Sequence, residues 1–179
     1  VVSERAIAVR DGPSIHECSI TDDYFIVFEL PVTLSLAALT QGFHFPFRWN
    51  KNRPARVGLL PRTGSSDDIV WCDVDPCYVF HVANSVQHAD GSVTIDCCTY
   101  ESMFAHGPDG PNGVPCGLER WHVNPATQKV TRATIDASPQ EFPRIDERFF
   151  GQPYRHTWTV SQPSEAVSNF VADNALYHH

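Results

Sequence analysis

The fold is decided by residues 78–99, which read YVFHVANSVQHADGSVTIDCCT. The first part, Tyr78 to Asn84, is apolar on both faces, and this pattern is typical of a strand buried on both sides. Asp90-Gly91 is a dipeptide that favours a tight turn. The second part, Ser92 to Thr99, is again rich in β-branched residues. These residues predict a β-hairpin, the strongest such signal in the chain, and a β-rich domain around it.

The same pattern recurs on both sides of this hairpin. Apolar and β-branched runs bounded by turn residues predict further strands. In the strand expected at residues 154–160, alternation places Tyr154, His156, Trp158 and Val160 on one face. The expected strands span residues 24–30, 56–60, 69–74, 118–123, 129–136, 154–160 and 166–172.

Two stretches depart from the strand pattern. Thr33 to Phe47 contains closely spaced Leu and Ala residues and predicts one or two helical turns. Ser102 to Gly117 is rich in Gly and Pro and predicts a long loop, for which a functional role and an ordinary surface excursion are equally favoured. Short strands joined by tight turns favour a sandwich, a barrel or a propeller, and periodicity does not choose among the three.

Composition excludes several classes of function. Net charge is −8, with only 13 Lys and Arg, and no basic run is present, which argues against nucleic-acid binding and against purely electrostatic attraction to anionic lipid. No apolar stretch reaches the length of a membrane span. Glycine-rich phosphate loops and nucleophile elbows are absent from the sequence.

The six cysteines do not form the pattern of a secreted disulfide scaffold. Cys97 and Cys98 lie in a predicted strand and are expected to be buried thiols. Cys72 and Cys77 have no partner pair at zinc-finger spacing. This cysteine usage predicts a reducing, cytoplasmic setting.

His81 lies among apolar neighbours in the decisive hairpin. A buried neutral imidazole must satisfy two ring nitrogens. Spacing alone favours a core histidine bonded to backbone over a metal ligand, although a neutral imidazole in a dry strand also suits Fe(II). His16 follows Gly12-Pro13-Ser14-Ile15 and precedes a predicted strand, at the kind of strand mouth where site residues occur.

Three segments, in this order, resemble the carotenoid cleavage dioxygenase family, which includes lignostilbene-cleaving enzymes. Residues 14–27 are similar to a family motif of His-Asp-Phe followed by Thr, Tyr and an apolar strand, with His16, Thr21 and Tyr24 in register. Phe80-His81-Val82-Ala83-Asn84 is similar to its Phe-His-x-x-Asn strand. Residues 140–146 are similar to its Glu-Phe-Pro segment.

Further stretches extend the resemblance over essentially the whole chain. Residues 56–62 resemble a family strand that ends in Pro-Arg, and residues 118–125 resemble the outer hairpin of a blade. Two departures bear on substrate choice. Glu17-Cys18 stands where the family has Asp-Phe, and Asn84-Ser85-Val86-Gln87 stands where it has Asn-Ala-x-Glu.

The resemblance implies a seven-bladed β-propeller with Fe(II) on its axis, held by four histidines. His16 would be the second ligand, His81 the third, and Glu141 the carboxylate that orients His81. The chain, residues 1–179, would then be a partial propeller domain of about three blades, truncated at both ends, with the other ligands outside it. This fragment alone is expected to be inactive, not to hold iron tightly and to self-associate through exposed strand edges.

The activity implied by the resemblance is cleavage of a C=C bond of a carotenoid, apocarotenoid or stilbene by O₂, giving two carbonyl products. The partners would be O₂ and an apolar conjugated substrate in a dry, aromatic-lined tunnel. Two alternatives are a non-catalytic β-rich binding module without a complete metal site and a lyase or isomerase on the same scaffold. Peripheral membrane contact through Leu34 to Leu39 is a further hypothesis, but a buried helix is favoured there. His44, His106 and His156 would be candidate ligands if the isolated chain held iron.

Overall fold

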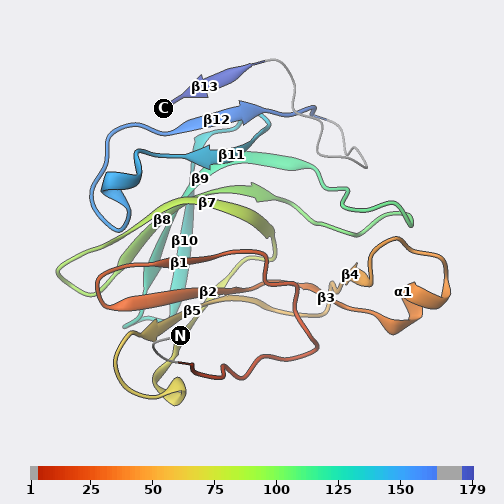
Figure 1. Ribbon diagram of the computed structural model, residues 1–179, viewed down its shortest axis with the longest axis horizontal. Helices are drawn as coiled ribbons and strands as arrows, with labels where there is room; N and C mark the ends of the chain where they lie inside the picture. The colour runs from red at the N-terminus through yellow and green to blue at the C-terminus, as the bar shows by residue number, and fades with distance from the viewer. Residues whose placement is uncertain (1–3, 165–174) are drawn as a thin grey trace.

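The computed structural model describes residues 4–164 and 175–179, and nearly all regular structure in them is β-strand (Figure 1). The all-β prediction is therefore confirmed. The strands are β1 (Cys18–Ile20), β2 (Tyr24–Glu29), β3 (Val32–Leu34), β4 (Phe47–Trp49), β5 (Ala55–Pro61), β6 (Val70–Val74), β7 (Tyr78–Gln87), β8 (Val93–Tyr100), β9 (Pro115–Asn124), β10 (Lys129–Asp136), β11 (Gln140–Arg144), β12 (Trp158–Ser161) and β13 (Leu176–His178). The helices are α1 (Leu36–Thr40) and the 3-10 turns η1 (Ser66–Asp68) and η2 (Glu147–Phe149).

The described strands form two four-stranded antiparallel units, a three-stranded sheet and a two-stranded sheet of β3 and β4. The first unit runs β1-β2-β5-β6 and the second β7-β8-β9-β10. They meet where β10 lies parallel to β6, through the single pair Lys129 and Asp73. A third sheet has the order β11-β12-β13. Four-stranded antiparallel units repeated side by side are the blades of a β-propeller, and the described residues supply two such blades and most of another.

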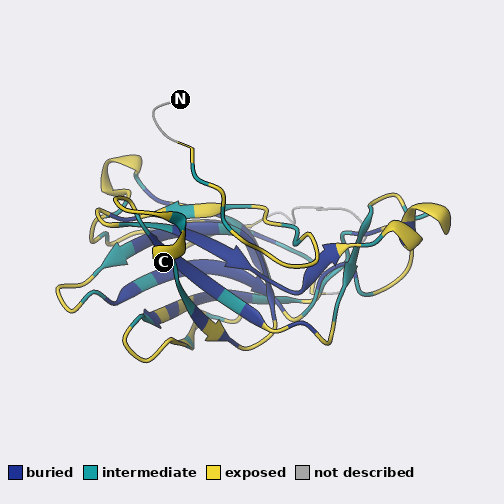
Figure 2. Cartoon of the chain, turned by 90° about the horizontal axis from the view of Figure 1, so that it is seen from below, coloured by how far each residue is buried: buried dark blue, intermediate teal, exposed yellow. Residues whose placement is uncertain are grey.

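The core lies between the two complete blades. The ring of Phe28 in β2 lies 6.1 Å from the ring of Trp121 in β9, and Trp121 is fully buried. Figure 2 shows buried residues along the middle of the strands and exposed residues at the loops. Apolar side chains on the facing surfaces therefore hold the blades together by burial.

The decisive hairpin forms as predicted. β7 and β8 pair antiparallel, and β7 continues three residues beyond the expected end, to Gln87. The His88 N–H donates to the Ser92 carbonyl at 2.8 Å, and Gly91 takes a φ of +82° that favours glycine in this tight turn. Cys97 and Cys98 are both fully buried, as expected, and all six cysteines are free thiols.

The strand predicted at residues 154–160 is wrong in its first half. β12 begins only at Trp158, because the Tyr154 hydroxyl donates to the buried Asp96 carboxylate of β8 and holds the preceding segment against that strand. The loop predicted at residues 102–117 is shorter than expected, since β9 begins at Pro115. The strand expected at residues 166–172 lies outside the described residues.

The helical turns expected near residue 36 are present, but the expectation that this helix is buried is wrong. Ser35 caps α1 by accepting the Ala38 N–H, and only Ala38 of this helix is buried. Leu36 is 71% exposed and Leu39 is 54% exposed. The helix is the tip of an extension formed by β3, α1 and β4 that projects from the blades (Figures 1 and 2). The five-residue helix is too short and too far from the core to bury an apolar face.

No helix among residues 4–164 and 175–179 has the length and apolar character needed to cross a membrane.

Candidate metal centre

His16 and His81 lie together, although 65 positions separate them in the chain. His16 stands two residues before β1, the first strand of the first blade, and His81 stands in β7, the first strand of the second. The centroids of the two imidazole rings are 5.2 Å apart, with the ring planes nearly perpendicular. The side chain of His81 is 17% exposed, whereas His16 is exposed. The juxtaposition expected from the resemblance is therefore present.

The backbone around His81 is held by the segment that carries His16. The pairing of β7 with β8 shifts register between Val79 and Val82, so the strand bulges at His81. His16 Nδ1 lies 3.0 Å from the Phe80 carbonyl oxygen, and the Glu17 carboxylate accepts the Val82 N–H at 2.5 Å. Side chains of two consecutive residues thus bind the backbone groups on both sides of His81. Such bulges often re-aim a side chain next to a functional site.

Glu141 holds the His81 ring from the third sheet. Its Oε2 atom accepts a hydrogen bond from His81 Nδ1 at 2.7 Å and a second from the Phe142 N–H at 2.6 Å. Glu141 is completely buried, and its other oxygen, Oε1, is buried without a hydrogen-bond partner in the part of the chain that the structure describes. The expected hydrogen bond between Glu141 and His81 is therefore present, and the carboxylate is shielded from water.

These hydrogen bonds select the tautomer of both imidazoles. A backbone carbonyl can only accept, so His16 Nδ1 must carry the hydrogen toward Phe80. The Glu141 oxygen already accepts the Phe142 N–H and likewise receives the His81 Nδ1 hydrogen. In the neutral rings both Nε2 atoms then keep free lone pairs, which is the form of histidine that binds metal ions. The two side chains fit a metal centre by this criterion.

Two further groups sit near the buried Glu141 carboxylate. Burial, and after it the negative charge of Glu141, raises the pKa of Tyr100 and the pKa of Cys98 well above their usual range. Both side chains are therefore neutral at physiological pH. The Tyr100 hydroxyl donates its hydrogen to Gln162 at 2.8 Å. It is therefore an uncharged hydroxyl beside the Glu141 carboxylate.

Aromatic rings flank the two imidazoles. The Phe80 ring lies 5.0 Å from His16, edge-on, and the Phe142 ring lies 5.0 Å from His81. The residues that directly follow the two histidines, Glu17 and Val82, help to line a cavity of about 490 Å³. Its full lining consists of residues 17–20, 82–84, 143–144, 147 and 150–151. Its polar members include Glu17, Asn84 and Arg144, so this cavity does not match the dry, aromatic-lined tunnel that was expected.

Within residues 4–164 and 175–179, no group of three or more His, Cys, Asp or Glu side chains is arranged to hold a metal ion. The other candidate histidines lie in different surroundings. His44 pairs with Asp109 at 3.2 Å, and His156 Nδ1 lies 3.0 Å from His178 Nε2. The described residues thus bring two imidazoles together, without a third candidate ligand beside them.

Two residues of the site escaped the sequence analysis. Glu17 attracted notice only as a departure from the family motif, and its bond to Val82 depends on the bulge in β7. Phe142 was noticed only as part of Glu-Phe-Pro. The exceptional feature of Phe142 is a backbone φ of +53°, which local sequence does not predict because Pro143 follows it.

The fold is that of a β-propeller, and it brings His16, just before β1, beside His81 of β7. The whole chain, residues 1–179, matches the family described as RPE65, retinal pigment epithelial membrane protein. The chain therefore belongs to this family of carotenoid-cleaving oxygenases and their relatives.

Individual relatives agree with this assignment. A carotenoid cleavage oxygenase of Mycobacterium tuberculosis is 33% identical over 196 residues, covering 86% of this chain and 39% of the relative. Resveratrol cleavage oxygenase 1 of Chaetomium globosum is 27% identical, covering 88% and 32%. The chain thus spans less than two fifths of the length of these relatives.

Two solved structures support the fold. Cobalt-substituted apocarotenoid oxygenase of Synechocystis superposes with a TM-score of 0.71 and 26% identity, covering 86% of this chain and 34% of that one. A lignostilbene dioxygenase of Pseudomonas brassicacearum gives a TM-score of 0.71, with 83% and 33% covered.

Proposed function

We propose that the full-length protein containing this chain is a non-haem Fe(II) dioxygenase that cleaves a C=C bond of a carotenoid, apocarotenoid or stilbene. The observation that carries the proposal is the convergence of His16 and His81. Each has its Nδ1 atom engaged and its Nε2 atom free of hydrogen-bond partners among the described residues. Both atoms of O₂ would be incorporated, one into each of the two carbonyl products, so the reaction needs no other oxidant or reductant.

The described residues have distinct roles in this proposal. His16 and His81 would supply two imidazole ligands, and Fe(II) with an open coordination position would supply the activation of O₂. Glu141 holds the His81 ring in one tautomer and one orientation. Glu17 and the His16 ring hold the backbone on either side of His81, so the spacing of the two imidazoles is set by hydrogen bonds.

The substrate class follows from the surroundings of the histidines and from the relatives. The rings of Phe80 and Phe142 give the centre an apolar border suited to a conjugated chain. The named relatives include a carotenoid cleavage oxygenase and a resveratrol cleavage oxygenase. Both substrate types are conjugated alkenes.

The test uses the full-length protein, purified anaerobically and loaded with Fe(II). We expect about one iron per chain by elemental analysis, and cleavage of an apocarotenoid or of resveratrol under ¹⁸O₂ with one labelled oxygen in each carbonyl fragment. His81→Ala should abolish both iron binding and cleavage. His122→Ala, at an exposed position in β9, is the matched control and should change neither. Iron-free protein, or products without label, would refute the proposal.

The isolated chain of 179 residues should behave differently. Two imidazoles chelate a metal ion more weakly than four, and strand edges without neighbours favour association with other chains. We expect substoichiometric iron and self-association in size-exclusion chromatography. A monodisperse monomer with one tightly bound iron would contradict this and would point to a different ligand set.

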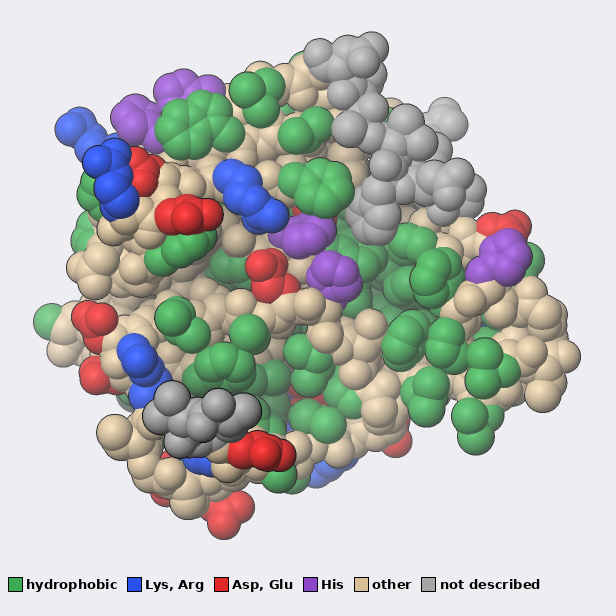
Figure 3. Space-filling model, viewed as in Figure 1, with side chains coloured by type: hydrophobic (Ala, Val, Ile, Leu, Met, Phe, Trp, Pro, Cys, Tyr) green, Lys and Arg blue, Asp and Glu red, His purple; other side chains and the backbone are tan. Residues whose placement is uncertain are grey.

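Peripheral membrane contact is proposed through the extension formed by β3, α1 and β4. Large apolar side chains gather there (Figure 3), and four of them are exposed: Leu34 49%, Leu36 71%, Leu39 54% and Phe45 42%. An exposed apolar patch of this kind suits the interface of a bilayer. Leu36→Asp with Leu39→Asp should reduce co-sedimentation of the full-length protein with phosphatidylcholine vesicles. Asp substitutions at Thr40 and Gln41, on the same extension, are the charge-matched control.

A further inference from the structure

Phe142 has a backbone conformation that is exceptional for an aromatic residue. Its φ is +53°, in the left-handed region that glycine and asparagine adopt most readily. The pairing of β11 with β12 explains where the strain arises. Glu141 pairs with Val160 and Arg144 with Trp158, so β11 carries one extra residue and bulges. The left-handed position of one common type of bulge is normally glycine.

The bulge has a consequence for the metal centre. It removes the Phe142 N–H from the strand ladder, and this N–H donates instead to Glu141 Oε2 at 2.6 Å. The same oxygen accepts a hydrogen bond from His81 Nδ1 at 2.7 Å. Strained backbone conformations persist where the surrounding structure over-determines them, and they cluster at functional sites.

We propose that Phe142 is a positioning residue whose left-handed backbone fixes the Glu141 carboxylate and, through it, the His81 ring. Two donors hold one carboxylate oxygen, while the other, Oε1, has no hydrogen-bond partner within residues 4–164 and 175–179. Without the Phe142 N–H, the carboxylate is free to rotate and exchange its two oxygens, and His81 Nδ1 loses its fixed acceptor. The inference rests on the proposed function, because it concerns the ring expected to bind iron.

The Phe142 ring offers a competing explanation, since it packs 5.0 Å from the His81 ring. The two explanations rank substitutions in opposite orders. If the backbone matters, residues that tolerate a positive φ should preserve the site, and β-branched residues should disrupt it. If the ring matters, large apolar residues should preserve the site and glycine should be worst.

The experiment measures iron affinity by chelator competition in the full-length protein with Gly, Asn, Leu or Val at this position. We expect Phe142→Gly and Phe142→Asn to weaken iron binding less than about tenfold, and Phe142→Val to weaken it about 10- to 100-fold. Phe142→Leu should fall between them. Retention of iron by the Leu and Val variants with loss in the Gly and Asn variants would overturn the inference.

Phe104 provides a control, because it is a phenylalanine that also has a positive φ, +54°, and it packs against Phe45 and Phe47 rather than against the two imidazoles. Phe104→Gly and Phe104→Val should change the unfolding midpoint of the protein and leave the iron affinity as it is. Equal effects on iron at both positions would reduce the role of Phe142 to general stability and would also overturn the inference.

A second readout keeps the inference separate from the proposed function. In metal-free protein, ¹⁵N NMR of the histidine side chains reports whether His81 Nδ1 carries a hydrogen-bonded proton. This signal should persist in Phe142→Gly and shift in Phe142→Val. A parent protein that binds no iron would refute the proposed function, and the NMR result would then decide the role of Phe142 alone. An unshifted His81 Nδ1 signal in Phe142→Val would overturn the inference that Phe142 positions the His81 ring.

Discussion

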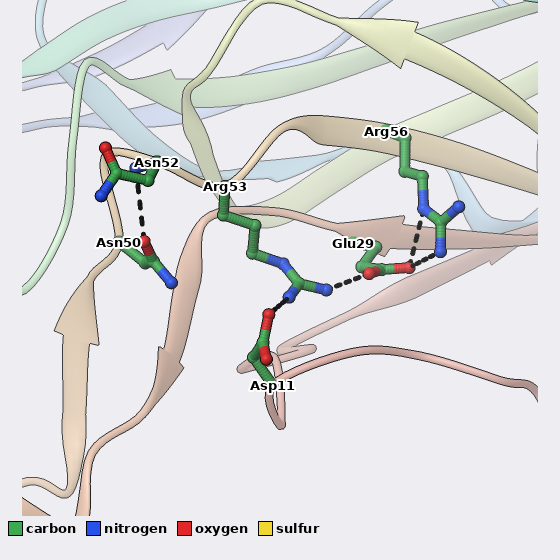
Figure 4. A network of polar contacts seen from close by, with 6 residues as sticks. All are labelled: Asp11, Glu29, Asn50, Asn52, Arg53 and Arg56. Atoms are coloured by element: carbon green, nitrogen blue, oxygen red, sulfur yellow. Dashed lines mark hydrogen bonds and ion pairs between the residues drawn. The ribbon is translucent and has the colours of Figure 1, made fainter.

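Two buried carboxylates, Glu29 and Glu141, have opposite environments. Glu29 has a 3% exposed side chain, and both its oxygens are bound by the guanidinium groups of Arg53 and Arg56; Asp11 binds the other side of Arg53 (Figure 4). Glu141 has a fully buried side chain, and the described residues bind only one of its oxygens, through the His81 ring and a backbone N–H.

The contrast separates a structural carboxylate from one that serves a site. Two cations neutralise Glu29, and its network joins the N-terminal segment to the first blade. Among the described residues, the only ion-pair partner of Glu141 is His81. A metal ion bound at the free Nε2 atom of His81 would place positive charge close to this carboxylate. Under the proposed function, this bound metal ion would compensate the buried negative charge of Glu141.

The largest effect is expected from breaking the Glu29 network. Arg53→Met removes the buried guanidinium that binds one oxygen of Glu29, while Arg56 still binds the other. One oxygen of a buried carboxylate then loses its charged partner, which should cost about 3 kcal/mol in the free energy of unfolding. Urea unfolding of the full-length protein measures this loss. Arg148→Met is the control, because Arg148 and Asp146 form an exposed pair, and it should leave stability almost unchanged. Similar losses from both variants would contradict the structural role of Glu29 and Arg53.

Glu141→Gln should act on metal binding rather than on folding. The neutral amide orients and polarises His81 less well, so iron affinity should fall about 10- to 100-fold. The matched variant Glu29→Gln should destabilise the fold without a selective effect on iron. Chelator competition and urea unfolding, both applied to the two variants, test the contrast directly. Unchanged iron affinity in Glu141→Gln would remove the functional half of the comparison.

Glu17→Ala should have a smaller effect. It removes the acceptor of the Val82 N–H, but both residues line the 490 Å³ cavity, so water can replace the lost partner. We expect a loss of about 1 kcal/mol in unfolding free energy and a modest decrease in iron affinity. Glu17→Gln keeps an acceptor oxygen and should lie closer to the parent protein in both measurements. The reverse order would show that the charge of Glu17 matters more than its hydrogen bond.

The smallest effect is expected at the thiols. Burial raises the pKa of Cys77 to about 12, and burial followed by the charge of Glu141 raises the pKa of Cys98. The thiolate is the reactive form, so these cysteines should resist alkylation at pH 8 while exposed Cys18 reacts first. Glu141→Gln removes only the lesser cause, and Cys98 should stay unreactive. Mass spectrometry of iodoacetamide-treated native protein measures this, and prompt labelling of Cys98 would contradict its burial.

Much of the fold could be predicted from local sequence patterns, and the errors in that prediction have identifiable causes. Residues 78–99 formed the expected hairpin because alternation, β-branching and the Asp-Gly turn all favour it. The strand expected from Tyr154 failed because a distant partner, Asp96, captures its hydroxyl. The three-residue strands β1, β3, β4 and β13 were not predicted, since three residues carry too little periodicity to detect.

The sequence by itself determined the β-rich architecture, the two candidate histidines and, through the family motifs, the carboxylate at Glu141. These depend on residue type and local order, which a sequence displays directly. Only the tertiary structure decided that Glu17 holds the His81 backbone, that Phe142 adopts a positive φ and that α1 is exposed. Each of these depends on contacts between segments far apart in the chain, or on their absence. The physical reason is that hydrogen bonds and burial depend on distance in space, which spacing along the chain does not specify.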